Sequence, residues 1–102
     1  MYRGTTPTIT LRLSFDPRSA SKIWVTFAQS IEEENIFFTK ELSDCTLDET
    51  SIRVRLSQEE TLSFAGCRRV QVQARMRFPD GVAVATRIFE IPTNRILKDG
   101  VI

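Results

Sequence analysis

Residues 68 to 78 alternate between apolar and polar side chains, and this stretch constrains the fold more than any other part of the chain. A period of two is the pattern of a β-strand with one buried and one solvated face. The apolar positions are Val70, Val72, Ala74, Met76 and Phe78, and the polar ones between them are Arg69, Gln71, Gln73, Arg75 and Arg77. Pro79-Asp80-Gly81 follows with turn chemistry, because proline presets φ, aspartate can bond its own backbone and glycine tolerates a positive φ. The stretch therefore predicts the first strand and the turn of a β-hairpin.

The returning strand, residues 82 to 91, has apolar side chains on both faces. Val82, Val84 and Ile88 would lie on one face, and Ala83, Ala85, Phe89 and Ile91 on the other. A strand of this kind is either central and covered on both sides or irregular, with a bulge near Arg87. Both alternatives are compatible with the pattern.

Similar patterns predict the rest of the fold. Alternation indicates strands over residues 8–15, 22–28 and 51–57, and a further strand is expected over residues 36–40. The acidic run Glu32-Glu33-Glu34 would lie in the turn from residue 29 to 35 that joins two of these strands. Ser57 followed by Glu60 matches a capping box, which predicts a short helical turn near residues 58–64.

The length of 102 residues fits one domain with a real core. We expect an all-β fold, a two-layer antiparallel β-sandwich (Ig-like) of six to seven strands with one short helical turn. The sandwich would span residues 8–92, preceded by an extended arm at 1–7 and followed by a tail at 93–102. The composition, 41% hydrophobic and 26% charged, is that of a globular protein.

Catalytic chemistry has little support in the sequence. The chain has no histidine, so a histidine-based general acid or base is excluded. The acidic clusters lack the glycine-punctuated spacing of a calcium loop, and no glycine-rich phosphate loop is present. We therefore expect a protein that is not an enzyme and has no cofactor, no metal site and no small-molecule substrate.

The two cysteines and the apolar pattern bear on the compartment. Cys45 and Cys67 form no CxxC motif, and we interpret them as free, partly buried thiols, with a disulfide between them left open. No run approaches the roughly 20 apolar residues of a membrane span, and no apolar segment follows residues 1–6 to act as a signal. We expect an intracellular protein.

Arginine dominates the positive charge, with 11 of the 14 basic residues. This residue suits planar, partly desolvated contacts with a partner. Arg53 and Arg55 share the outer face of one predicted strand, and Arg69, Arg75 and Arg77 share the outer face of another. We expect the two strands to be adjacent, which would stack these arginines into one basic row interleaved with glutamines. The row is either a solvated face or a protein-binding surface; nucleic acid is disfavoured by the net charge of +1 and by the lack of interleaved aromatic residues. Trp24 faces away from the predicted core, either as an interface anchor or covered by a loop.

Three segments carry a resemblance to a known family. They are Tyr2-Arg3-Gly4-Thr5-Thr6-Pro7-Thr8, Leu56-Ser57-Gln58-Glu59-Glu60-Thr61-Leu62-Ser63-Phe64 and Arg95-Ile96-Leu97-Lys98-Asp99-Gly100-Val101-Ile102. In these segments the chain resembles small virion-associated β-sandwich proteins encoded by Firmicutes prophages and gut phages. It departs from them in a longer acidic tip around residues 31–35.

The resemblance implies a phage structural or accessory protein of the head, tail or baseplate. Such a protein would act by binding phage structural proteins or copies of itself. Contact with a membrane is not expected, because the net charge is only +1. The protein would be used in several copies as a homo-oligomer and would occupy the host cytoplasm during assembly and then the virion. The alternative is a small phage effector that binds and inhibits a host protein, and a weaker third hypothesis is glycan binding through Trp24.

Overall fold

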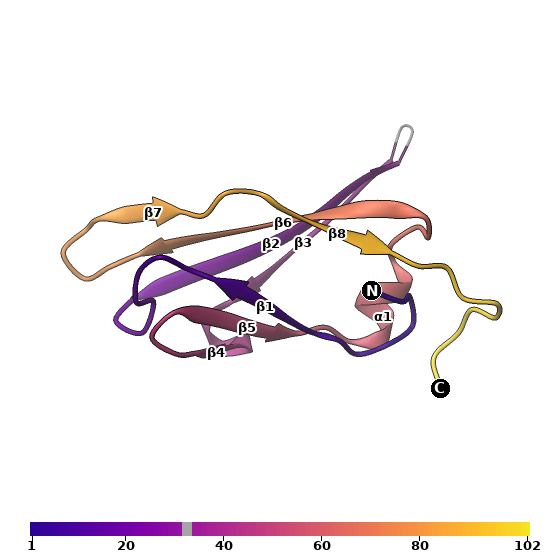
Figure 1. Ribbon diagram of the computed structural model, residues 1–102, viewed down its shortest axis with the longest axis horizontal. Coiled ribbons are helices and arrows are strands. Elements are labelled where there is room, and N and C mark those ends of the chain that lie inside the picture. Colours follow the sequence, from indigo (N-terminus) through magenta and orange to yellow (C-terminus); the bar gives the residue numbers. More distant parts are fainter. Residues whose placement is uncertain (32–33) are drawn as a thin grey trace.

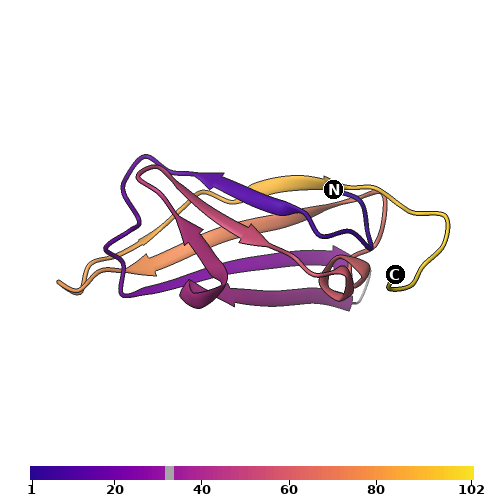
Figure 2. The same ribbon diagram turned by 90° about the horizontal axis from the view of Figure 1, so that it is seen from below.

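The alternating segments form eight strands in two antiparallel sheets, in a computed structural model that describes residues 1–31 and 34–102. The smaller sheet has the order β1-β5-β4, and the larger has the order β3-β2-β6, with β7 and β8 both paired to the far side of β6. Both termini and the α-helix of the described residues lie at one end of the molecule (Figure 1), and the view turned by 90° agrees (Figure 2). The elements are β1 (Thr8–Arg12), β2 (Lys22–Ile31), β3 (Glu34–Glu41), the 3-10 turn η1 (Leu42–Asp44), β4 (Cys45–Leu47), β5 (Ser51–Arg55), α1 (Gln58–Leu62), β6 (Arg68–Arg77), β7 (Ala83–Ala85) and β8 (Phe89–Thr93). The predicted two-layer antiparallel all-β fold is confirmed.

The core lies between the two sheets and is made by the inward faces that the alternation predicts. From β6 it takes Val70, Val72, Ala74 and Met76, from β2 Ile23, Val25 and Phe27, and from β5 Ile52 and Val54, all of them buried. Burial of these side chains is the main stabilising contribution, at about 25 cal/mol for each Å² of apolar surface removed from water. Outward neighbours such as Arg75 and Arg53 are exposed.

The turn at Pro79-Asp80-Gly81 is the predicted one. The Phe78 N–H donates to the Val82 carbonyl at 2.9 Å, the Gly81 N–H donates to the Phe78 carbonyl at 2.9 Å, and the Val82 N–H donates to Asp80 Oδ1 at 3.0 Å. Gly81 has a φ of +89°, a conformation that glycine adopts without strain. The chain thus reverses in the way that the residue types indicate.

The returning half of the hairpin is an edge and not a central strand. It is interrupted between β7 and β8, where Thr86 donates its N–H to the Ala74 carbonyl at 2.9 Å and accepts the Ala74 N–H on its hydroxyl at 3.1 Å. Of the two alternatives for this strand, the central and doubly covered one is wrong. The interruption lies at residues 86–88, close to Arg87, where the other alternative placed a bulge. Several of its apolar side chains, Val82 and Ile88 among them, are instead exposed at the sheet edge.

The capping box begins α1 as predicted. The Glu60 N–H donates to Ser57 Oγ at 3.1 Å, and the Ser57 N–H donates to Glu60 Oε1 at 2.7 Å, so two helix-end donors are satisfied reciprocally. Phe64 then packs into the core against Phe38, with ring centroids 5.5 Å apart. A salt bridge of 2.7 Å from Lys40 Nζ to Glu60 Oε2 ties α1 to β3.

Two segments differ from the prediction. β2 continues to Ile31, so Gln29, which was expected in a turn, lies on the inner face of the sheet and is only 2% exposed. The segment after β3 contains η1 and the three-residue strand β4, which has too few residues to show a period. These elements and the interrupted edge raise the count to eight strands from the expected six to seven. The acidic residues Glu32 and Glu33 lie outside the described residues.

The N-terminal residues, expected to form an extended arm, pack on their own domain. Residues 1–3 run beside residues 92–94, with the Met1 ammonium donating to the Pro92 carbonyl at 2.8 Å and the Asn94 N–H donating to the Met1 carbonyl at 2.7 Å. The guanidinium of Arg3 donates to the carbonyls of Leu62 and Phe64 and forms a salt bridge with Asp99. Arg3 therefore joins the N-terminal residues, the end of α1 and the tail.

Candidate interaction surface

Trp24 and three cationic residues gather on the outer face of the larger sheet. β2 and β6 are antiparallel neighbours, and their register places Lys22 opposite Arg77 and Trp24 opposite Arg75. Directly opposed residues of an antiparallel pair project from the same face, so all four side chains point away from the core. We call this set, Lys22, Trp24, Arg75 and Arg77, the Trp24 surface.

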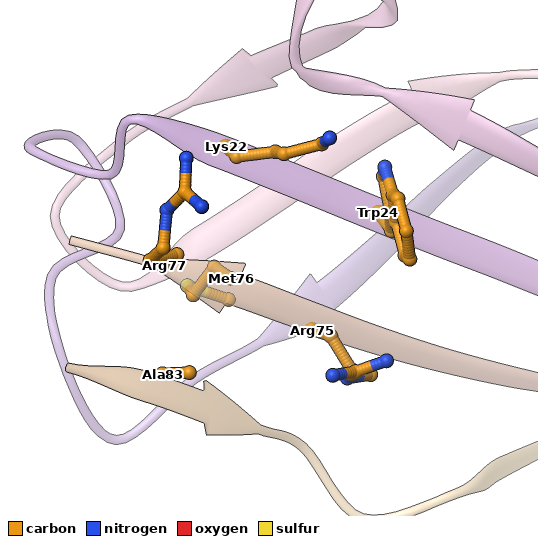
Figure 3. Close-up of a pocket in the computed structure, with 6 residues that line it drawn as sticks. All are labelled: Lys22, Trp24, Arg75, Met76, Arg77 and Ala83. Carbon is orange, nitrogen blue, oxygen red and sulfur yellow. The ribbon is translucent and has the colours of Figure 1, made fainter. Parts of the chain in front are cut away.

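The indole of Trp24 is flanked by two of these cations. Lys22 Nζ lies 4.8 Å and Arg75 Cζ lies 5.9 Å from the centroid of the indole ring, which are cation–π distances. Figure 3 shows Lys22 and Trp24 on one strand and Arg75 and Arg77 on the next. With Met76 and Ala83, the four line an open depression of about 200 Å³. Trp24 remains 40% exposed, so the ring is held in place while part of it faces solvent.

The three cations of this surface form no ion pair within the described part of the chain. None of the ion pairs found there involves Lys22, Arg75 or Arg77. Glu41 lies opposite Trp24 on β3, on the side away from β6, and is not in an ion pair with these cations either. The arrangement can therefore accept carboxylates, which a guanidinium binds in a bidentate manner.

The other predicted arginines are placed elsewhere, and the prediction of a single basic row on adjacent strands is wrong. Arg53 and Arg55 lie on β5, which belongs to the smaller sheet between β1 and β4. Their outer face is that of the opposite layer. There Arg53 Nη2 is 3.8 Å from Asp48 Oδ2, and Arg55 Nη2 donates to Thr6 Oγ1 at 3.4 Å.

Arg69 shares β6 with Arg75 and Arg77 but lies toward its other end. It is opposite Pro92, and its Nη1 is 3.4 Å from Glu90 Oε2. Of the six predicted binding residues, the structure thus brings together Trp24, Arg75 and Arg77 and adds Lys22, while Arg53, Arg55 and Arg69 lie apart from them.

A second exposed aromatic residue lies on the same face. Phe37 of β3 is 68% exposed and is opposite Ala28 of β2. Between it and Trp24 lies the pair Thr26 and Thr39, whose hydroxyl oxygens are 3.1 Å apart. Alternation within the strand indicates that Phe37 faces outward. Its neighbours Ile36 and Phe38 are also apolar, so the outward position is not evident from side-chain polarity.

The two thiols differ from each other. Burial raises the pKa of the half-buried Cys45 thiol to about 11, and Cys67 is exposed at a φ of +63°, so the expectation that both are partly buried is wrong for Cys67. Both cysteines are free. Within residues 1–31 and 34–102, no three histidine, cysteine or acidic side chains are close enough together to hold a metal ion.

Comparison of the chain with models of protein families, with curated proteins and with solved structures finds no match. The described helices are all too short to cross a membrane.

Proposed function

We propose that this protein acts by binding another protein through the Trp24 surface, as a structural or accessory component of a phage particle. The observation that carries the binding proposal is a half-exposed indole held between cations that have no carboxylate partner in the described chain. The phage context comes from the resemblance of the sequence segments at both ends and around α1. The protein would work without catalysis and without a cofactor, in the host cytoplasm during assembly and in the virion.

The chemistry of the surface specifies the partner. Tryptophan and arginine are the residues that most often dominate binding energy at protein interfaces, because a large rigid side chain and a planar cation lose little entropy on contact. Arg75 and Arg77 project on the same side of β6, two residues apart, and suit aspartate or glutamate side chains of a partner. An acidic segment with an apolar residue that packs on the exposed part of Trp24 would match this surface.

The test is incorporation into particles. A tagged parent chain and its variants are expressed during phage growth, particles are purified, and the copy number of each chain is measured by mass spectrometry. Trp24→Ala and Arg75→Glu each remove a residue of the kind that costs about 2 kcal/mol or more at an interface, so incorporation at limiting concentration should fall about 30-fold.

Arg55→Glu is the matched control, since it reverses the same charge on the outer face of the opposite layer. It should be incorporated as well as the parent. Particles without the parent chain would end the structural role and leave inhibition of a host protein as the remaining proposal. Normal incorporation of Arg75→Glu would exclude the Trp24 surface.

A further inference from the structure

The sheet edges of this protein are unequally protected. An edge strand exposes unpaired N–H and C=O groups, and proteins limit pairing there with short strands, interruptions or proline. The edge formed by β7 and β8 is interrupted at residues 86–88, contains Pro92 and is lined at its end by residues 1–3. β1 has five residues and β4 has three.

β3 is neither short nor interrupted, and its inward-facing charge, Lys40, is paired with Glu60 of α1 at 2.7 Å. It has eight residues, pairs with β2 in an unbroken register from Glu34 to Glu41, and ends the larger sheet, with its other side unpaired in the described chain. It contains no proline. A long, regular and unpaired edge is a template for another strand.

The side chains of β3 are suited to pairing with an identical strand. Phe37 projects from the outer face and is 68% exposed, with Asn35 and Thr39 exposed on either side of it. Ile36 and Phe38 project from the inner face, where both are half-buried against the core and Phe38 stacks on Phe27 with ring centroids 5.2 Å apart. The strand is thus nearly palindromic around Phe37, with polar, apolar, aromatic, apolar and polar side chains in order.

This symmetry selects one register for an antiparallel pair of identical strands. Centred on Phe37, the pair places Phe37 opposite Phe37, Ile36 opposite Phe38 and Asn35 opposite Thr39. Apolar side chains thus oppose apolar ones, and polar side chains oppose polar ones. Centred on Phe38, it would place Ile36 opposite Lys40. Centred on Ile36, it would place Phe37 opposite Asn35. A register that places Phe37 opposite Ile36 or Phe38 would set outer-face residues against inner-face residues.

We propose that a second copy of this chain pairs with β3 edge to edge about a two-fold axis at Phe37, which joins the two larger sheets into one continuous sheet. The contact is isologous, so it closes after two copies and does not propagate. It covers Phe37 of each copy with Phe37 of the other. The inference goes beyond the proposed function, because it concerns the edge of the sheet and not the Trp24 surface, which lies on β2 and β6.

Light scattering after size-exclusion chromatography, over a wide range of protein concentration, tests the pairing. The parent should have twice the 11.7 kDa mass of one chain. Phe37→Lys should have the mass of one chain, because the two-fold axis would place two ammonium groups opposite each other, and Phe37→Glu should do the same with two carboxylates. An equimolar mixture of the two variants should recover the double mass, since lysine then opposes glutamate.

Val82→Lys is the matched control, because Val82 is also an exposed apolar residue, with 51% of its surface accessible, but lies outside β3. It should keep the double mass, and so should Trp24→Ala, which separates this proposal from the proposed function. Hydrogen exchange supplies an independent readout: amides 35–39 should all be protected in the parent, and those directed away from β2 should lose protection in Phe37→Lys.

A parent with the mass of one chain at every concentration would overturn the proposal. So would a Phe37→Lys variant that keeps the double mass. Failure of the Lys and Glu variants to associate with each other would exclude the two-fold register at Phe37.

Discussion

Gln29→Leu should destabilise the folded protein by about 2 kcal/mol. The buried amide of Gln29 accepts the Ala65 N–H at 2.7 Å and donates to the Ala65 carbonyl at 3.0 Å, which holds the segment between α1 and β6 against β2. Leucine has a similar size but neither donor nor acceptor, so both backbone groups lose their partner. An unpaired buried group costs about 1 to 3 kcal/mol. Ala65 is only half-buried and water can reach it in part, so we take the lower value for each of the two groups.

Urea and thermal unfolding, followed by circular dichroism, measure this loss. A chain of this size has a total stability of about 5 to 15 kcal/mol. A loss of about 2 kcal/mol should lower the melting temperature by about 8 to 16 °C. Gln71→Leu is the control, because Gln71 is exposed on β6 of the same sheet, and it should change stability by less than about 0.5 kcal/mol.

A glutamate at the same position separates lost hydrogen bonds from altered packing. A neutral glutamic acid can still donate to the Ala65 carbonyl, whereas a carboxylate cannot, so the folded state should raise the pKa of the new side chain. The stability of Gln29→Glu relative to the parent should therefore be greatest below the unfolded pKa of about 4.3 and decline as the pH rises through the folded-state pKa. An unchanged unfolding midpoint in Gln29→Leu, or a Gln29→Glu variant without this pH dependence, would refute the reasoning.

Two further predictions concern titrating groups. Burial raises the pKa of Glu60, but hydrogen bonds from Lys40 and from Ser57 outweigh that effect and the net pKa is lowered. The ionised Glu60 thus stabilises the fold above its unfolded pKa, and this contribution is lost as the pH falls through the lower folded-state pKa. Urea midpoints of Glu60→Gln should therefore change less with acid than those of the parent. Equal changes in the two proteins would contradict this role of Glu60. At neutral pH a thiol reagent should label Cys67 faster than Cys45, because Cys67 is exposed and the pKa of Cys45 is about 11. The fast phase of labelling should be lost in Cys67→Ser. Equal labelling rates for the two thiols would contradict the prediction.

Local patterns were enough to predict the inner and outer faces of the regular strands. Val70 and Val72 are buried, and Arg75 and Arg77 are exposed, because side chains alternate across any strand whatever its neighbours are. The turn at Gly81 and the cap at Ser57 were predictable for the same reason, since each depends on hydrogen bonds between residues a few positions apart.

Contacts between distant residues could not be predicted in this way. Gln29 is a polar residue at the end of an apolar pattern and was interpreted as a turn, because its partner Ala65 is 36 positions away and nothing local indicates the pair. The three-residue β4 was missed because it is held by pairing with β5 and has no period of its own.

The candidate surface shows the same division. That Trp24 and Arg75 face outward follows from the alternation within each strand, whereas their contact across the sheet follows from the register of β2 on β6. Arg53 and Arg55 face outward too, but strand order assigns them to the other layer. Strand order depends on how the apolar faces of all the strands pack together. The free energy of this packing comes from contacts across the whole core, so strand order cannot be predicted from any single segment of the chain.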